Sequence, residues 1–400
     1  MRKLLVLGIV LLFVASVASA QLAEVKVGKG DLKIDAILQA GFDYSMEEDE
    51  ATTYGYDEYI DWDGDGINDD TTFVPVYTTS GLNGQFTMNR ARLLLSGTIC
   101  PDRVKYFVQL EFRGSPAIKD YKMILLNYIP KTDIAIGRFL PNFTHYMPMH
   151  TGKLNTINYP LFLIDSRYNY AMWRQVGFQT TTTVENFAKW AFNVGVFNGM
   201  GVLSGPEANK DNFSDNNDAF DVFLRADFTK EIPASWIHFA AYAWMGNLLM
   251  KTDPDPYEAC GDRATNLFGF FGEYQHEDML TVKGEIVIGT EEQSEWEFVP
   301  AENKLKCVDC DDLKSMGFYA HAEYKVNPQW GILGRYDQFD PNTDLEDDAW
   351  TWITFGVNHY IDSWNAMIYL NYIAKLEQND WGATEKIKND VVLLQFQVAP

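Results

Sequence analysis

Long apolar runs are scarce in this chain of 400 residues, because only the N-terminus carries one and no later stretch reaches about 20 apolar residues. This absence excludes helical membrane spans from the rest of the chain. A β-barrel crosses a membrane with an apolar side chain at every second position only, so its strands would not form such runs. The negative mean hydropathy of −0.21 is therefore compatible with a membrane protein of the barrel class.

Basic residues are also few, since 32 Lys and Arg accompany 56 Asp and Glu and give a formal net charge of −24. Such an acidic surface repels nucleic acid, and we expect no nucleic-acid partner. The sequence contains neither a GxSxG nor an HExxH motif nor a Walker loop. We therefore predict that the protein is not an enzyme.

Four cysteines are too few for a disulfide scaffold. Cys307 and Cys310 form a CxxC motif in an acidic segment that we expect to be a loop, and Cys260 lies in another loop. A zinc site needs a second cysteine pair and a thioredoxin-like site needs a βαβ setting, and the sequence offers neither. We favour a disulfide, either between Cys307 and Cys310 or between loops, with Cys100 left over.

The N-terminal apolar run belongs to a predicted signal peptide at residues 1–20. Met1-Arg2-Lys3 precedes the apolar stretch 4–17, and Ala18-Ser19-Ala20 supplies the small residues after which a signal peptidase cuts. A transmembrane anchor is the alternative, although the run is short for a span. We expect cleavage near Ala20 and a mature chain 21–400 that forms one domain, because no linker or internal repeat divides it.

The clearest strand pattern lies between Phe86 and Arg113, where two alternating segments flank a break at Cys100-Pro101-Asp102. From Val104 onwards apolar and polar residues alternate with period two, which is typical of a β-strand with one apolar face. The pattern predicts a hairpin whose apolar face contacts either a second sheet or lipid.

Similar segments predict sixteen strands along the chain. They lie near residues 31–44, 85–99, 103–113, 121–129, 132–139, 174–183, 187–198, 218–229, 236–246, 265–276, 279–290, 315–326, 329–339, 350–361, 364–375 and 389–398. Short turns alternate with longer links, which lie at 45–84, 114–120, 140–173, 199–217, 247–264, 291–314, 340–349 and 376–388. Outer-membrane barrels have short periplasmic turns, long external loops and an even strand count. We therefore predict an all-β, antiparallel, up-and-down transmembrane β-barrel whose apolar face contacts outer-membrane lipid.

Three short motifs resemble one family of barrels. They are Arg90-Ala91-Arg92 followed by Gly97, Gly137-Arg138-Phe139-Leu140-Pro141, and Gly195-Val196-Phe197-Asn198-Gly199. Together they look like the phosphate-selective porin O/P family of Gram-negative outer membranes. The resemblance implies a sixteen-stranded barrel, usually a homotrimer, in the outer membrane. It also implies a third external loop, here 140–173, that folds inward and constricts the pore.

Basic side chains occupy the polar face of adjacent predicted strands, namely Arg90, Arg92, Arg103, Lys105 and Arg113. In a low-dielectric wall such a row attracts small anions. The alternative is that these cations pair with acids of the lumen and only keep the wall hydrated. The family's phosphate channels are described as using ladders rich in Lys and Arg, and the few basic residues of this chain depart from that pattern.

The predicted inward loop combines an apolar run, 161–164, with charged residues and two histidines. Such a run is seldom left exposed, so we expect it to pack against the inner barrel wall. Lys153 and Arg167 are then the predicted constriction cations. His145 and His150 either bind a metal ion or are ordinary loop residues.

An acidic motif in the first external loop (45–84) resembles the calcium loop of thrombospondin type 3 repeats, with Asp61, Asp63, Asp65, Ile67 (through its carbonyl) and Asp69 as ligands. Carboxylates at alternating positions around a Gly turn suit Ca²⁺, although the final Glu of an EF-hand is missing, so binding would be weak. The alternative is a plain acidic loop tip. Acidic loops elsewhere could hold divalent cations that bridge to lipopolysaccharide.

These features predict an outer-membrane porin, a passive diffusion channel for small hydrophilic solutes or ions with a bias toward anions such as phosphate. One alternative is a barrel plugged by its loops, with a binding or structural role that uses the calcium-stabilised loop. A hydrolase site on the barrel is a second alternative.

Overall fold

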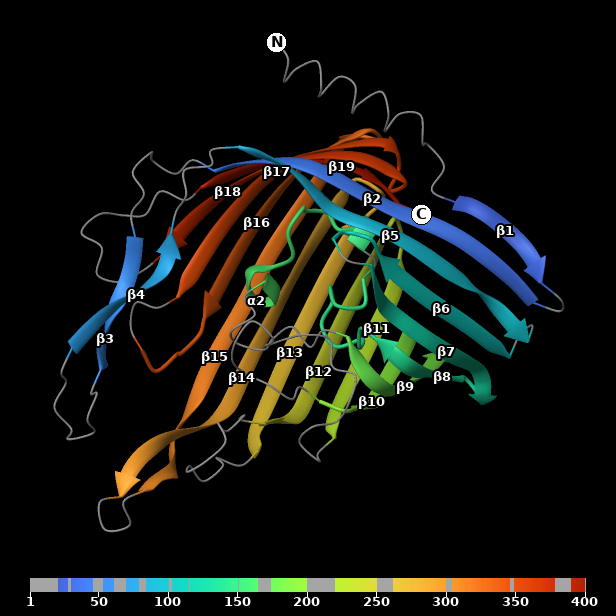
Figure 1. Cartoon of the computed structure of the whole chain (residues 1–400). Coiled ribbons are helices and arrows are strands. Elements are labelled where there is room, and N and C mark those ends of the chain that lie inside the picture. Colours follow the sequence, from blue (N-terminus) through green and yellow to red (C-terminus); the bar gives the residue numbers. More distant parts are fainter. Residues whose placement is uncertain are drawn as a thin grey trace.

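The fold is a closed antiparallel β-barrel, seen in a computed structural model of the chain (Figure 1). The structure describes residues 21–27, 30–45, 53–60, 70–78, 84–100, 103–114, 116–149, 151–164, 174–199, 220–249, 262–299, 304–345, 349–377 and 390–399. Within these ranges no helix has both the length and the apolar character needed to cross a bilayer.

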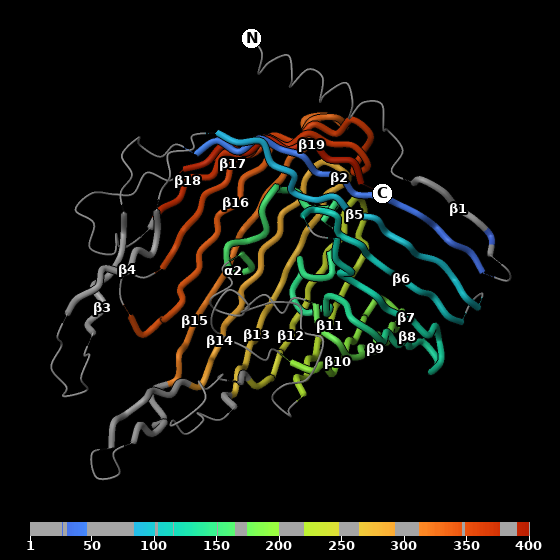
Figure 2. Tube along the Cα trace, viewed as in Figure 1, coloured from blue at the N-terminus to red at the C-terminus, as the bar shows by residue number. Residues whose placement is uncertain are grey.

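The barrel wall consists of sixteen strands, as predicted. They are β2 (Gly30–Ser45), β5 (Gln85–Cys100), β6 (Val104–Glu111), β7 (Ala117–Ile129), β8 (Thr132–Phe139), β9 (Gln175–Glu185), β10 (Lys189–Phe197), β11 (Asp221–Ile232), β12 (Ser235–Leu249), β13 (Asp262–His276), β14 (Leu280–Val299), β15 (Lys304–Asn327), β16 (Trp330–Asp340), β17 (Trp350–Asp362), β18 (Ala366–Glu377) and β19 (Val391–Val398). Each strand pairs with the next, and β19 pairs with β2 from Val391↔Ser45 to Val398↔Leu38, which closes the ring. In Figure 2, β2 accordingly lies between β19 and β5.

Alternating side chains separate the two faces of the wall. On β16, for example, Ile332 and Tyr336 are exposed on the outer surface, whereas Arg335 and Asp337 are buried inside. An outer surface of this kind suits lipid, and the polar residues then face the lumen. The alternation therefore assigns the same two faces that the period-two pattern predicts.

Short connections join the strands at one rim of the barrel. Several of them contain a non-glycine residue with positive φ, namely Lys131 (64°), Ala234 (57°), Glu277 (47°) and Ser363 (48°). This left-handed conformation lets a chain reverse within a few residues. The predicted short turns therefore correspond to real reversals of the chain.

Three additional strands lie outside the predicted set. Strand β1 (Gln21–Val27) pairs with the first residues of β2, and β3 (Thr53–Ile60) pairs with β4 (Asp70–Thr78) inside the predicted first loop. The proposed calcium ligands Asp61, Asp63, Asp65, Ile67 and Asp69 lie between β3 and β4, outside the described residues.

The prediction of a loop at 291–314 is wrong over most of that range. Strands β14 and β15 continue there as a paired hairpin, and only 300–303 lie between them. Cys307 and Cys310 thus belong to a strand, opposite Trp296 and Gln293. Residues three apart on a strand are separated by roughly 10 Å between Cα atoms, more than a disulfide usually spans. The backbone therefore does not favour the local Cys307–Cys310 bond.

Candidate functional site: a basic cavity beside the inward segment

The segment after β8 enters the barrel and crosses its interior (Figure 1). It comprises 140–149 and 151–164, and it includes the short 3₁₀ helix η1 (Thr151–Lys153) and the single-turn helix α2 (Leu161–Ile164). We call these residues the inward segment. The described part of the chain between β8 and β9 thus packs inside the barrel, while its role as a constriction of the pore stays a prediction.

Hydrogen bonds with side chains of the lumen hold the backbone of the inward segment in place. Glu285 accepts a bond from the His145 amide at 2.7 Å, and Asn371 accepts one from the Ile157 amide at 2.9 Å. Arg335 donates to the Asn158 carbonyl at 2.9 Å. An irregular backbone in the interior needs such partners, because an unpaired buried amide or carbonyl is costly. The polar residues of the wall therefore hold this segment in place.

Apolar contacts hold the other side of the inward segment. Leu161 and Phe162 are buried in an aromatic cluster with Tyr319 and Phe339, which project inward from β15 and β16. The rings of Phe162 and Tyr319 stack with centroids 6.2 Å apart. The prediction that the apolar run packs against the inner wall is confirmed.

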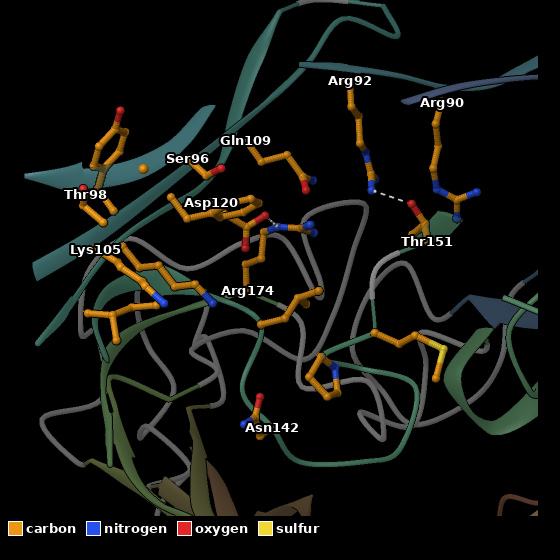
Figure 3. A pocket seen from close by; sticks show the side chains of 18 of the residues that line it. Arg90, Arg92, Ser96, Thr98, Lys105, Gln109, Asp120, Asn142, Thr151 and Arg174 are labelled. Atoms are coloured by element: carbon orange, nitrogen blue, oxygen red, sulfur yellow. Dashed lines mark hydrogen bonds and ion pairs between the residues drawn. The ribbon is translucent and has the colours of Figure 1, made fainter. Parts of the chain in front are cut away.

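A cavity remains between the inward segment and the wall formed by β2 and β5 to β7. Its volume is about 560 Å³. Five cationic side chains line it, together with two carboxylates (Figure 3). The cations are Arg90, Arg92, Lys105, Lys122 and Arg174, and the carboxylates are Asp31 and Asp120.

Two of the five cations are neutralised by carboxylates. Arg92 pairs with Glu111 at 2.6 Å, and Arg174 pairs with Asp120 at 2.8 Å. Arg92 also donates to the hydroxyl of Thr151 on the inward segment, at 3.3 Å (Figure 3). These ion pairs hold the side chains of Arg92 and Arg174 in place, and Arg92 also contacts the inward segment. Both pairs reduce the positive field in the cavity.

The other three cations have no carboxylate in ion-pair contact within the described part of the chain. Arg90 donates to the neutral Gln39 amide oxygen at 2.6 Å, and its guanidinium lies 6.0 Å from the Tyr159 ring centre. Lys122 lies 5.7 and 5.2 Å from the ring centres of Phe107 and Phe139. Rings and amides orient a cation without cancelling its charge. The cavity therefore keeps net positive charge.

A β-bulge in β5 turns Asn89 to the same side as Arg90. Gln39 pairs with Arg90 and Ala40 pairs with Met88, so Asn89 is the extra residue in the ladder. Asn89 donates to Gln395 of β19 at 2.8 Å while Met88 is exposed outside. A bulge lets two successive residues face the same side, and this one turns both Asn89 and Arg90 inward.

The predicted pore residues divide into three groups. Arg90, Arg92 and Lys105 line the cavity, whereas Arg103, Arg113 and Lys153 are exposed and do not line it. Arg167 and His150 lie outside the described residues.

Lys122 and Arg174 were not predicted, although each carries a sequence signal. Lys122 shares a strand with Asp120, and both face inward on β7. Arg174 directly precedes β9, at the end of the link that follows β8. Their proximity to Arg90 depends on barrel closure and on the course of the inward segment, which strand patterns alone do not encode.

Comparison with known proteins agrees with this architecture. Residues 292–399 match the family model described as phosphate-selective porin O and P. No curated protein sequence matches the chain.

Three solved structures share the fold at low sequence identity. The outer membrane channel DcaP of Acinetobacter baumannii has a TM-score of 0.57 at 12% identity, covering 95% of this chain and 100% of that one. An anion-selective porin from Comamonas acidovorans has 0.53 at 10% identity, covering 93% and 100%. The trimer form of OmpT, an outer membrane protein of Vibrio cholerae, has 0.50 at 12% identity, covering 92% and 99%.

The family match and the closed sixteen-stranded wall point to the same class of protein. Residues 292–399 match the model of the phosphate-selective porin O and P family, and the barrel that they help to close has the fold of outer-membrane channels.

Proposed function

We propose that the protein is an outer-membrane porin, a passive diffusion channel for small hydrophilic solutes that favours small anions. The observation that carries the proposal is the cavity between the inward segment and β5 to β7, in which Arg90, Lys105 and Lys122 have no described carboxylate in ion-pair contact. The channel class is supported by the family match, and the anion-selective Comamonas porin shares the fold.

The mechanism is electrostatic and passive. A cation in a wall surrounded by low-dielectric material raises the local concentration of anions and lowers that of cations. The neutralised pairs Arg92–Glu111 and Arg174–Asp120 contribute little net field but hold polar groups along the wall. No bond is made or broken, so the solute gradient sets the direction of flow.

The inward segment sets the width of the passage in this proposal. It fills the side of the lumen that faces β10 to β16 with aromatic side chains and leaves the basic side open. A solute would therefore pass beside Arg90 rather than along the barrel axis. If the segment instead closed the lumen, the barrel would be a plugged surface protein.

Neutralising the unpaired cations tests the anion preference. Replacing both Arg90 and Lys105 by Gln should move the reversal potential in a salt gradient toward that of an unselective pore, since the local anion excess falls. Lys131→Gln is the matched control, because Lys131 is exposed in the turn between β7 and β8 and does not line the cavity. An unchanged reversal potential in the double variant, or an equal change in the control, would count against the proposal.

Homotrimer assembly is part of the same proposal, and it is supported by the OmpT neighbour described as a trimer form. Light scattering of the detergent-solubilised protein, corrected for bound detergent, should give three chains per particle. A mass of one chain would contradict this part of the proposal without affecting the channel itself.

A further inference from the structure

Three potential metal ligands meet where the inward segment contacts β12 and β13. They are His145 of the segment, His238 of β12 and Glu273 of β13, and one ligand atom from each lies within 4.8 Å of the other two. His238 and Glu273 face each other directly in the strand register. Loop and wall thus contribute ligands to one point in the lumen.

The ring of His145 has an unsatisfied nitrogen at this point. Its Nε2 is buried and has no hydrogen-bond partner among the described residues. The ring stacks on Phe271 with centroids 3.9 Å apart and planes 10° apart, which fixes its orientation. A buried nitrogen without a partner costs free energy, and a bound cation would satisfy it.

His238 is oriented in the manner of a metal-binding histidine. Its Nε2 lies 2.9 Å from Oδ1 of Asp227, so this nitrogen donates, and a ring with one proton would carry its lone pair on Nδ1. Histidines that bind metals generally donate their other nitrogen to a carboxylate or carbonyl in this way. Asp227 is itself held by Arg225 through contacts of 2.7 to 3.0 Å.

The surrounding charges allow a divalent cation. Arg225 and Lys283 are the neighbouring cations, and Asp227, Glu273 and Glu285 are the neighbouring carboxylates. Arg225 is already engaged with Asp227, and Lys283 donates to Asn155 at 2.7 Å. Three carboxylates and two cations therefore surround the three ligands, and both cations have partners besides His145.

We propose that His145, His238 and Glu273 bind a divalent transition-metal ion, Zn²⁺ by ligand type, which joins the inward segment to the barrel wall. Two imidazoles and a carboxylate suit zinc, which accepts three protein ligands and a water. Nitrogen and oxygen ligands on tetrahedral zinc are roughly 3.4 Å apart, and the ligand atoms of the three side chains lie within 4.8 Å of one another. The site lies near the rim of short turns, since His238 is three residues after the start of β12.

Titration of Zn²⁺ into the tag-free, folded mature protein tests the site. Calorimetry should show one ion per chain, and His145→Ala, His238→Ala and Glu273→Gln should each weaken binding by more than about tenfold, because loss of even an outer partner of a metal ligand has that effect. His276→Ala is the matched control, as His276 is exposed at the rim and outside the cluster. Heat-dependent gel mobility establishes that each variant has folded.

A second readout separates this site from adventitious binding. Co²⁺ in place of Zn²⁺ should give the visible absorption of a tetrahedral ion in the parent protein and in His276→Ala, and lose it in Glu273→Gln. Absence of binding at 100-fold excess of Zn²⁺, or equal affinity in all variants, would overturn the proposal. The site does not rest on the channel proposal, so a barrel without conductance could still bind the ion.

Discussion

At the scale of single residues, the charge in the cavity depends on which cations have a carboxylate partner. Arg92 and Glu111 lie 2.6 Å apart with side chains 12% and 10% exposed, so neither charge is strongly screened by water. Arg90, two residues earlier on β5, donates to the Gln39 amide oxygen, and no carboxylate of the described residues forms an ion pair with it. Two neighbouring arginines of the same strand therefore differ in the field that they present to a solute.

Glu111→Gln should increase the anion preference. The substitution removes the carboxylate that neutralises Arg92 while keeping the shape of the side chain, so the cavity gains one unit of positive charge. The reversal potential of the variant in a salt gradient should move further toward that of anions. Stability should fall, since removing one partner leaves Arg92 half-buried without its countercharge. A shift toward cations would contradict the assignment of Arg92 to the conduction path.

Docking of the inward segment should weaken in acid through His145. Burial, followed by the nearby charges of Lys283 and Arg225, lowers the pKa of His145 well below its ordinary value of 6.5. The undocked histidine binds a proton more readily, so docking is fully stabilised above pH 6.5 and loses stability as the pH falls below that value. Hydrogen exchange of 140–149 in the metal-free protein should therefore be faster at pH 5 than at pH 7.5.

His145→Phe is the control for this pH dependence. Phenylalanine keeps the stacking on Phe271 but cannot take up a proton. The difference in exchange between the two pH values should become smaller in the variant. An undiminished difference would assign the effect to other groups, such as His238 or His321.

At the scale of elements, helix α2 reaches the wall only because β15 carries a glycine beneath it. A Cβ atom on Gly317 would lie 2.5 Å from Cβ and 2.9 Å from Cγ of Phe162. Phe162 is fully buried, so it has no room to move away. The close approach of helix and strand therefore requires glycine at this position.

Gly317→Ala should loosen the inward segment while leaving the barrel intact. Overpacking of this kind costs about 1–3 kcal/mol, which should appear as faster protease cleavage within 151–164. Gly334→Ala is the matched control on β16, because nothing lies within 4 Å of a Cβ atom there. Equal cleavage of the two variants would show that α2 does not depend on contact with Gly317.

The strands of the barrel wall could be predicted from this sequence more accurately than the connections between them. Each wall residue faces either lipid or lumen, so the period of two is present in the chain itself, and all sixteen predicted strands are found. Beyond the membrane both faces of a strand are hydrated, and acidic residues such as Glu295 or Asp309 no longer distinguish a strand from a loop. The extension of β14 and β15 was missed for that reason.

At the scale of the whole molecule, the lumen is divided into an aromatic side and a basic side. The inward segment packs on the aromatic residues of β10 to β16, and the cavity lies against β2 and β5 to β7. The sequence allowed the prediction of Arg90, Arg92 and Lys105, because their strand pattern is local. It did not allow the prediction of Lys122, Arg174 or the His145–His238–Glu273 cluster, since these depend on contacts between distant parts of the chain.

The central claim is that this barrel is an open, anion-preferring channel, and single-channel recording of the purified parent protein in a planar bilayer tests it most directly. An open, anion-preferring channel should give discrete conductance steps that are proportional to voltage, with a reversal potential in a KCl gradient displaced toward that of chloride. Bilayers that stay silent at several salt concentrations would contradict an open channel. Steps with a reversal potential displaced toward that of potassium would contradict the assignment of Arg90, Lys105 and Lys122 to the conduction path.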